Sequence, residues 1–208
     1  VVAGLEKKGR LMSKKEKEIV AFHESGHAIV ATVLPNADPV RRISIVPRGI
    51  SALGYTLQLP TEDRYLMTKT ELLDRLAVLL GGRVAEEIVF REISTGAHND
   101  LRRATDIATS MVKEFGMSDK LGYVTFEKEK KPLFLPSSLF PTREYSEDTA
   151  KQIDEEVKKI VDETYLRVKE ILTGKRDKLE ELARLVLEKE VVEEADLKRI
   201  LEIPPSNP

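Results

Sequence analysis

The chain has 208 residues, which is enough for one sizeable domain or for one domain with an appendage. Its 34 Lys and Arg nearly balance its 36 Asp and Glu, so the formal net charge of −2 gives no electrostatic basis for binding nucleic acid or an anionic membrane. Hydrophobic residues make up 41% and charged residues 34%, which favours a mainly α globular fold, and the absence of Cys excludes disulfides and leaves any metal to His, Asp or Glu.

The two ends of the sequence suggest a piece of a longer protein. The chain begins at Val1 instead of Met, and it ends in the Pro-rich run 204–208. We therefore expect residues 1–12 to be the end of a linker from a preceding domain and 204–208 to be a tail. No apolar stretch reaches the roughly 18 residues of a membrane-spanning helix, and no basic-then-apolar signal peptide is present. Any membrane anchor is therefore expected outside this sequence.

A first helix is predicted over residues 13–34. Ser13 and Glu16 have the spacing of a capping box, in which both side chains accept hydrogen bonds from the free N–H groups of a helix start. Pro35 ends the helix, because proline has no N–H and its ring clashes with the preceding turn. The apolar residues recur at helical spacing, at Ile19, Val20, Phe22 and Val30. This pattern indicates a helix with one face in the core.

Between residues 40 and 59 the pattern changes from helical to extended. Two short pieces, 42–46 and 53–57, are separated by Pro47 and Gly49, which favour turns. The arrangement predicts a small β-hairpin or ribbon. Such a ribbon is too small to form a hydrophobic core alone.

A second helix is predicted from Thr68 towards Val89. Thr68 and Glu71 repeat the capping-box spacing, and a leucine-rich helical pattern follows them. Gly81 and Gly82 interrupt this pattern. Because each glycine costs about 1 kcal/mol relative to Ala in a helix, we expect another helix to pack closely at this point.

A third helix is predicted from about residue 99 or 100 to residue 115, with Gly116 as its C-cap. We expect residues 13–120 to form the core of the domain. Residues 121–145 contain three prolines and a cluster of charges. An exposed, irregular loop is therefore expected there.

The last part of the chain, 146–203, is expected to form helices that serve packing or oligomerisation. Two long amphipathic stretches, 146–172 and 175–187, are hinged at 173–174, and a short third stretch covers 193–201. The expected fold is thus mainly α, with a helical domain, a small β-ribbon and a carboxy-terminal helical appendage. The apolar positions that suit subunit packing include Ile160, Leu179, Leu182 and Leu185.

The run His23-Glu24-Ser25-Gly26-His27 lies inside the first predicted helix and has the spacing of a metal-binding motif. Residues four apart project from one face of a helix, so His23 and His27 can place two imidazole nitrogens on one metal ion. Glu24 lies beside them, where its carboxylate can act on a water molecule as a general base. The alternative is a pair of core histidines. A helix-interior glycine such as Gly26 favours the metal site, because it permits another segment to approach closely.

A catalytic zinc ion usually has three protein ligands and one open position, so a third ligand is needed. The Gly-x-x-His extension that often follows such a motif is absent after His27. Spacing alone does not choose among the four remaining candidates, which are Glu86, Glu87, His98 and Asp100.

Three segments of the sequence resemble one known family. They are residues 18–28 (EIVAFHESGHA), 79–87 (LLGGRVAEE) and 94–101 (STGAHNDL). Together they resemble the carboxy-terminal peptidase domain of the FtsH family of membrane-anchored, ATP-dependent zinc metalloproteases. The resemblance covers almost the whole chain. It implies that residues 13–120 are a zinc-peptidase core and that residues 1–12 are the end of a linker from an ATPase domain.

The resemblance also chooses the third ligand. It implies one Zn²⁺ per chain, bound by His23, His27 and Asp100. His98 then becomes a neighbour of the site instead of a ligand. Glu24 is implied to be the general base.

The function that the resemblance implies is a zinc-dependent endopeptidase that degrades unfolded or membrane-extracted polypeptides, as the proteolytic part of an ATP-dependent protease. It further implies a homo-oligomer, namely a hexameric ring, at the cytoplasmic side of the inner or plasma membrane. ATP and the membrane would be bound only through parts outside this sequence, and this fragment is expected to be soluble. One rival is a helical oligomerisation module with a vestigial zinc site. Another is a zinc hydrolase for small molecules, which would need a closed pocket.

The sequence does not decide the roles of two groups of residues. Glu86 and Glu87 either orient a ligand histidine from behind or only face solvent and form ion pairs. The second group is either an exposed edge strand, on which an extended substrate adds as a further strand, or a merely structural ribbon. It consists of Leu53, Gly54, Tyr55 and Thr56.

Overall fold

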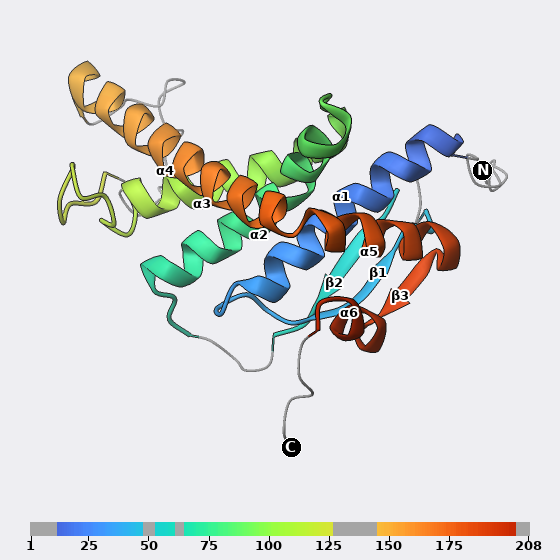
Figure 1. Ribbon diagram of the computed structural model, residues 1–208. Coiled ribbons are helices and arrows are strands. Elements are labelled where there is room, and N and C mark those ends of the chain that lie inside the picture. Colours follow the sequence, from blue (N-terminus) through green and yellow to red (C-terminus); the bar gives the residue numbers. More distant parts are fainter. Residues whose placement is uncertain (1–11, 48–52, 61–64, 127–144, 203–208) are drawn as a thin grey trace, which may run out of the picture.

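The computed structural model describes residues 12–47, 53–60, 65–126 and 145–202 (Figure 1). Within these ranges the chain is mainly helical and has one small antiparallel sheet, which confirms the predicted fold class. The helices are α1 (Lys14–Val33), α2 (Lys69–Phe90), α3 (His98–Lys113), α4 (Glu147–Gly174), α5 (Arg176–Lys189) and α6 (Glu194–Ile200), with a 3-10 turn at Thr95–Ala97. The strands are β1 (Val40–Ser44), β2 (Tyr55–Gln58) and β3 (Val191–Glu193).

Both predicted capping boxes are present. The Ser13 hydroxyl accepts a hydrogen bond from the Glu16 N–H at the start of α1, and the Glu16 carboxylate accepts one from the Ser13 N–H. Thr68 and Glu71 make the same pair of bonds at the start of α2. These local interactions fix the residues at which α1 and α2 begin.

The sheet has the strand order β2-β1-β3, with both pairings antiparallel. The predicted ribbon is the β1–β2 pair, but β3 was not predicted from sequence. Helix α1 contacts β1 and β2, and α5 and α6 contact β3 (Figure 1). In the described part of the chain β2 pairs only with β1, so it is an edge strand.

The carboxy-terminal helices share the core of the rest of the molecule. Helix α4 packs on α2 and α3, and α5 packs on α1 (Figure 1). The predicted hinge at 173–174 belongs to the end of α4, and the break between α4 and α5 lies one residue later, at Lys175. Fully buried side chains from four helices meet in one cluster, which includes Ile29, Leu76, Leu80, Leu172, Leu179 and Leu182.

Some predictions lie outside the described residues. They concern residues 1–11 of the linker at 1–12, residues 127–144 of the loop at 121–145, and the tail at 204–208. Among the residues that are described, no helix has both the length and the apolar character needed to cross a membrane.

Helices α1 and α2 cross in close contact, as the paired glycines predict. A Cβ atom added to Gly26 would lie 2.4 Å from the Gly81 carbonyl oxygen and 2.6 Å from the Ala85 Cβ. A Cβ on Gly81 would in turn lie 2.8 Å from the Gly26 oxygen. Real Cβ atoms do not approach other atoms this closely, so the crossing requires glycine on both helices.

We predict that Gly26→Ala lowers the free energy of unfolding by about 1–3 kcal/mol, because overpacking forces the two helix backbones apart. Gly174→Ala is the control, since an added Cβ there meets no atom within 4 Å. This control is expected to leave stability unchanged or to raise it by up to about 1 kcal/mol. Urea unfolding followed by circular dichroism measures both. Equal stability of the two variants would contradict the close crossing.

Candidate metal centre

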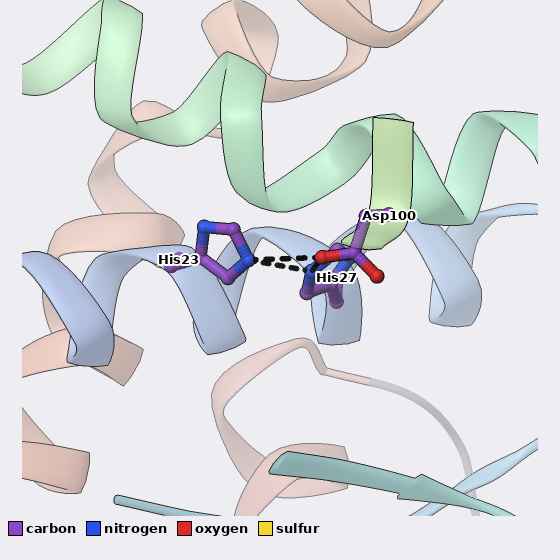
Figure 2. Close-up of side chains that lie close together, drawn as sticks. All are labelled: His23, His27 and Asp100. Carbon is purple, nitrogen blue, oxygen red and sulfur yellow. Dashed lines mark hydrogen bonds and ion pairs between the residues drawn. The ribbon is translucent and has the colours of Figure 1, made fainter. Parts of the chain in front are cut away.

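Three side chains from two helices converge on one point (Figure 2). His23 and His27 lie on successive turns of α1, and their Nε2 atoms are 3.0 Å apart. Asp100 lies in the first turn of α3, with its Oδ2 atom 3.4 Å from His23 Nε2 and 3.5 Å from His27 Nε2. Among the described residues, no other group of His, Cys, Asp or Glu side chains brings three potential ligand atoms this close together.

The spacing of these three atoms fits a tetrahedral metal ion. Zinc bonds to nitrogen and oxygen are about 2.0–2.1 Å long, so neighbouring ligand atoms of a tetrahedral site lie about 3.3 Å apart. The three observed separations, from 3.0 to 3.5 Å, surround that value. Two nitrogens and one carboxylate oxygen also leave a fourth position for water or substrate.

The other ring nitrogen of each histidine is bound from behind by α2. His27 Nδ1 donates to the carbonyl oxygen of Val78 at 2.7 Å, and His23 Nδ1 donates to Glu86 Oε1 at 2.6 Å. Because Nδ1 of each ring carries the proton that is donated in these hydrogen bonds, a neutral ring has its lone pair on Nε2, which faces the centre. The second oxygen of Glu86 accepts a hydrogen bond from the Ser94 N–H at 2.8 Å.

The electrostatics of the cluster favour positive charge at its centre. Burial alone would lower the pKa of His23, but its hydrogen bonds to Asp100 and Glu86 and the nearby charge of Glu24 outweigh burial and raise the pKa to about 9. Burial would raise the pKa of Asp100, yet hydrogen bonds from His23 and His27 hold it well below its usual value. The pKa of Glu86 is also lowered, because bonds from His23 and Ser94 outweigh its burial.

Glu24 lies beside the cluster and is 8% exposed. Its carboxylate Oε2 accepts a hydrogen bond from the Thr56 hydroxyl of β2 at 2.8 Å. A cavity of about 590 Å³ joins this carboxylate to the cluster and to β2. Its lining includes His23, Glu24, His27, Gly54, Tyr55 and Asp100.

Residues 10–200 of the sequence match the model of peptidase family M41. The chain belongs to this family.

Three relatives carry names of ATP-dependent zinc metalloproteases. The FtsH of Pseudothermotoga lettingae is 58% identical over 97% of this chain, the FtsH of Thermotoga maritima is 53% identical over 97%, and FtsH 4 of Synechocystis sp. is 55% identical over 97%. The chain spans 32%, 33% and 32% of these relatives, or about a third of their length.

The four candidates for the third ligand lie at different places in the structure. Asp100 points to the two histidines, whereas His98, two residues earlier, is exposed. Glu86 is 1% exposed and lies behind His23. Glu87 faces α4 instead, where it accepts hydrogen bonds from Tyr165 at 2.6 Å and from Lys169 at 2.9 Å. The pKa of Glu87 is lowered by these two bonds.

Sequence reasoning missed two contacts of the M41 site. The Val78 carbonyl that binds His27 is a backbone group, so no residue type could have revealed it. Thr56 was placed on the predicted edge strand, but its contact with Glu24 depends on how the strand packs against α1. The motif serine, Ser25, is fully buried, and its hydroxyl makes no hydrogen bond within the described part of the chain.

We predict that Asp100→Ala weakens zinc binding by more than about 100-fold, since even the loss of an outer partner of a ligand costs about 10- to 100-fold. His98→Ala removes an exposed side chain from the same helix and should leave zinc bound. A side-by-side titration of the two variants with a zinc chelator measures this difference. The opposite ranking would make His98 the third ligand.

Proposed function

We propose that this chain is a zinc-dependent endopeptidase that degrades unfolded or membrane-extracted polypeptides. The observation that carries the proposal is the convergence of His23, His27 and Asp100 next to the buried carboxylate of Glu24. The names of the relatives and membership of family M41 support the same activity. The rival, an oligomerisation module with a vestigial site, is not favoured because the three ligands and the carboxylate are all present.

The proposed mechanism assigns one role to each residue. His23, His27 and Asp100 would hold one Zn²⁺, which, when bound, lowers the pKa of water towards about 7 and polarises the scissile carbonyl. Glu24 accepts a proton from the attacking water and then delivers it to the leaving amine. Glu86 fixes the ring of His23 through the Nδ1 hydrogen bond, so that Nε2 stays aimed at the centre.

An extended polypeptide suits the cavity better than a small molecule. The cavity follows the edge strand, because it is lined by Leu53, Gly54, Tyr55 and Thr56 as well as by the cluster. An extended substrate can add to such an edge by backbone hydrogen bonds, which are independent of its side chains. We therefore propose β2 and the two residues before it as the strand that aligns the substrate.

For the longer protein we propose an ATP-dependent protease in which this chain is the proteolytic part. The relatives are about three times as long and are named as ATP-dependent. By resemblance to the FtsH family, the proposal includes a hexameric ring held at the cytoplasmic side of a membrane. ATP and membrane binding would then reside in parts of the protein outside this sequence.

The test of the function is Glu24→Gln. We predict that this variant keeps its zinc, because Glu24 is not among the three converging ligands, and that casein hydrolysis falls by at least about 10² to 10⁴, the usual scale for losing a general base. Metal analysis and an activity assay on the same preparation check both parts. Loss of zinc together with activity would make Glu24 a ligand, and hydrolysis by fully metal-free wild-type protein would end the proposal.

A second prediction concerns Glu86. We predict that Glu86→Gln weakens zinc binding by about 10- to 100-fold, because the carboxylate accepts from His23 and Ser94 with different oxygens and the amide replaces one of them with an NH2 group that cannot accept. The matched control is Glu87→Gln on the next position of α2, whose carboxylate contacts Tyr165 and Lys169 instead. Chelator competition measures zinc affinity without reference to activity. If the two variants bind zinc equally, Glu86 does not support the site.

A further inference from the structure

The carboxylate of Glu24 is held by a side chain from a different element. The Thr56 hydroxyl lies 2.8 Å from Glu24 Oε2 and 3.1 Å from the Glu24 carbonyl oxygen. A hydroxyl has one hydrogen, so it can donate fully to only one of these acceptors at a time. The carboxylate is both nearer and charged, which makes it the stronger acceptor.

The residue just before this strand, Gly54, lies against the other carboxylate oxygen. A Cβ atom added to Gly54 would lie 3.0 Å from Glu24 Cγ, 3.0 Å from Glu24 Oε1 and 2.7 Å from Val20 Cγ1. The segment therefore approaches the carboxylate so closely that a side chain at position 54 would have to displace Glu24 or Val20. Glu24 is thus confined by Gly54 and bound by Thr56, both from the same short segment.

We propose that Thr56 is a positioning residue for the general base. Its hydroxyl holds Oε2 and thereby fixes the orientation of the carboxylate that accepts the proton. Thr56 itself does not touch the reacting atoms. This inference rests on the proposed peptidase function and adds a residue to it.

The position of Thr56 links the base to the proposed substrate strand. Thr56 pairs with the fully buried Ile43 of β1, so the sheet fixes its backbone. A peptide that added to the edge of β2 opposite β1 would be aligned by the same strand that orients Glu24. Substrate alignment and base orientation would then depend on one strand, which favours a constant geometry for different peptide sequences.

The test compares three single variants of the full chain. Thr56→Val removes the hydroxyl but keeps the shape and the strand preference of the side chain. Thr56→Ser keeps the hydroxyl. Thr32→Val is the control, because Thr32 also lies on α1, and among the described residues its hydroxyl donates to the Ala28 carbonyl, at 2.7 Å, and not to Glu24. Hydrolysis of an unstructured fluorogenic peptide gives kcat and KM, and zinc content and thermal unfolding are measured on the same samples.

We expect Thr56→Val to lower kcat about tenfold or more, which is the scale of losing one hydrogen bond to a charged group, while KM and zinc content stay close to those of the wild type. Thr56→Ser should restore most of kcat, and Thr32→Val should behave as the wild type. The inference is overturned if Thr56→Val keeps the wild-type kcat, if only KM or thermal stability changes, or if Thr56→Ser is as slow as Thr56→Val.

A failure of the positioning role of Thr56 can be distinguished from a failure of the proposed peptidase function. If the wild-type chain with zinc does not cleave the peptide, the peptidase proposal fails before any variant is compared. If the wild type is active and Glu24→Gln is not, the peptidase proposal stands whatever Thr56→Val does. The Thr56 variants then test the positioning role alone.

Discussion

The close crossing of α1 and α2 is the constraint on which the rest of the site depends. Gly26 and Gly81 let the two backbones touch, and this contact lies between the two histidines of the motif. Only at this distance can α2 reach the rear of both rings, with Glu86 on His23 and a backbone carbonyl on His27. Each glycine lowers the stability of its own helix. Together, however, the two glycines allow the hydrogen bonds from α2 that orient both Nε2 atoms toward one point.

The charge balance of the site gives a second physical reason for a cation. Three carboxylates, from Glu24, Glu86 and Asp100, surround two imidazoles in a largely buried region. Buried negative charges are costly unless they are paired, and the pKa of His23 is raised to about 9 because a proton supplies part of the missing positive charge. A divalent cation among His23, His27 and Asp100 would meet the same need more completely, since it brings two positive charges to the point where the three ligand atoms converge.

Features that depend on neighbours along the chain could be predicted from the sequence. The two capping boxes, including Ser13 with Glu16, and the placement of His23 and His27 on one helix face follow from spacings of three or four residues. The third ligand could not be derived in this way. Asp100 is 77 residues away from His23 in sequence, so only the packing of α3 brings them together, and the resemblance to a known family had to stand in for that information.

Packing also decides what adjacent residues do. Glu86 and Glu87 are neighbours on α2 and are chemically identical, yet one faces the histidine and the other faces α4, a difference that no local pattern could resolve. Strand β3 was missed for a similar reason. It has only three residues, and its partner β1 lies about 150 residues earlier, so its stability comes from the pairing of Ile43 with Val192 and not from its own sequence.

The site combines a few specific side chains with many backbone groups. The chemistry is assigned to four residues of α1 and α3, whereas much of their support comes from the Val78 carbonyl, the Ser94 N–H and the strand before and within β2. A substrate that is aligned by the edge of a strand would likewise be recognised through its backbone. Because backbone groups are the same in every polypeptide, a site built in this way places little demand on the sequence that it cleaves. The proposed activity on unfolded chains would require this property, and the position of β2 beside Glu24 supports it.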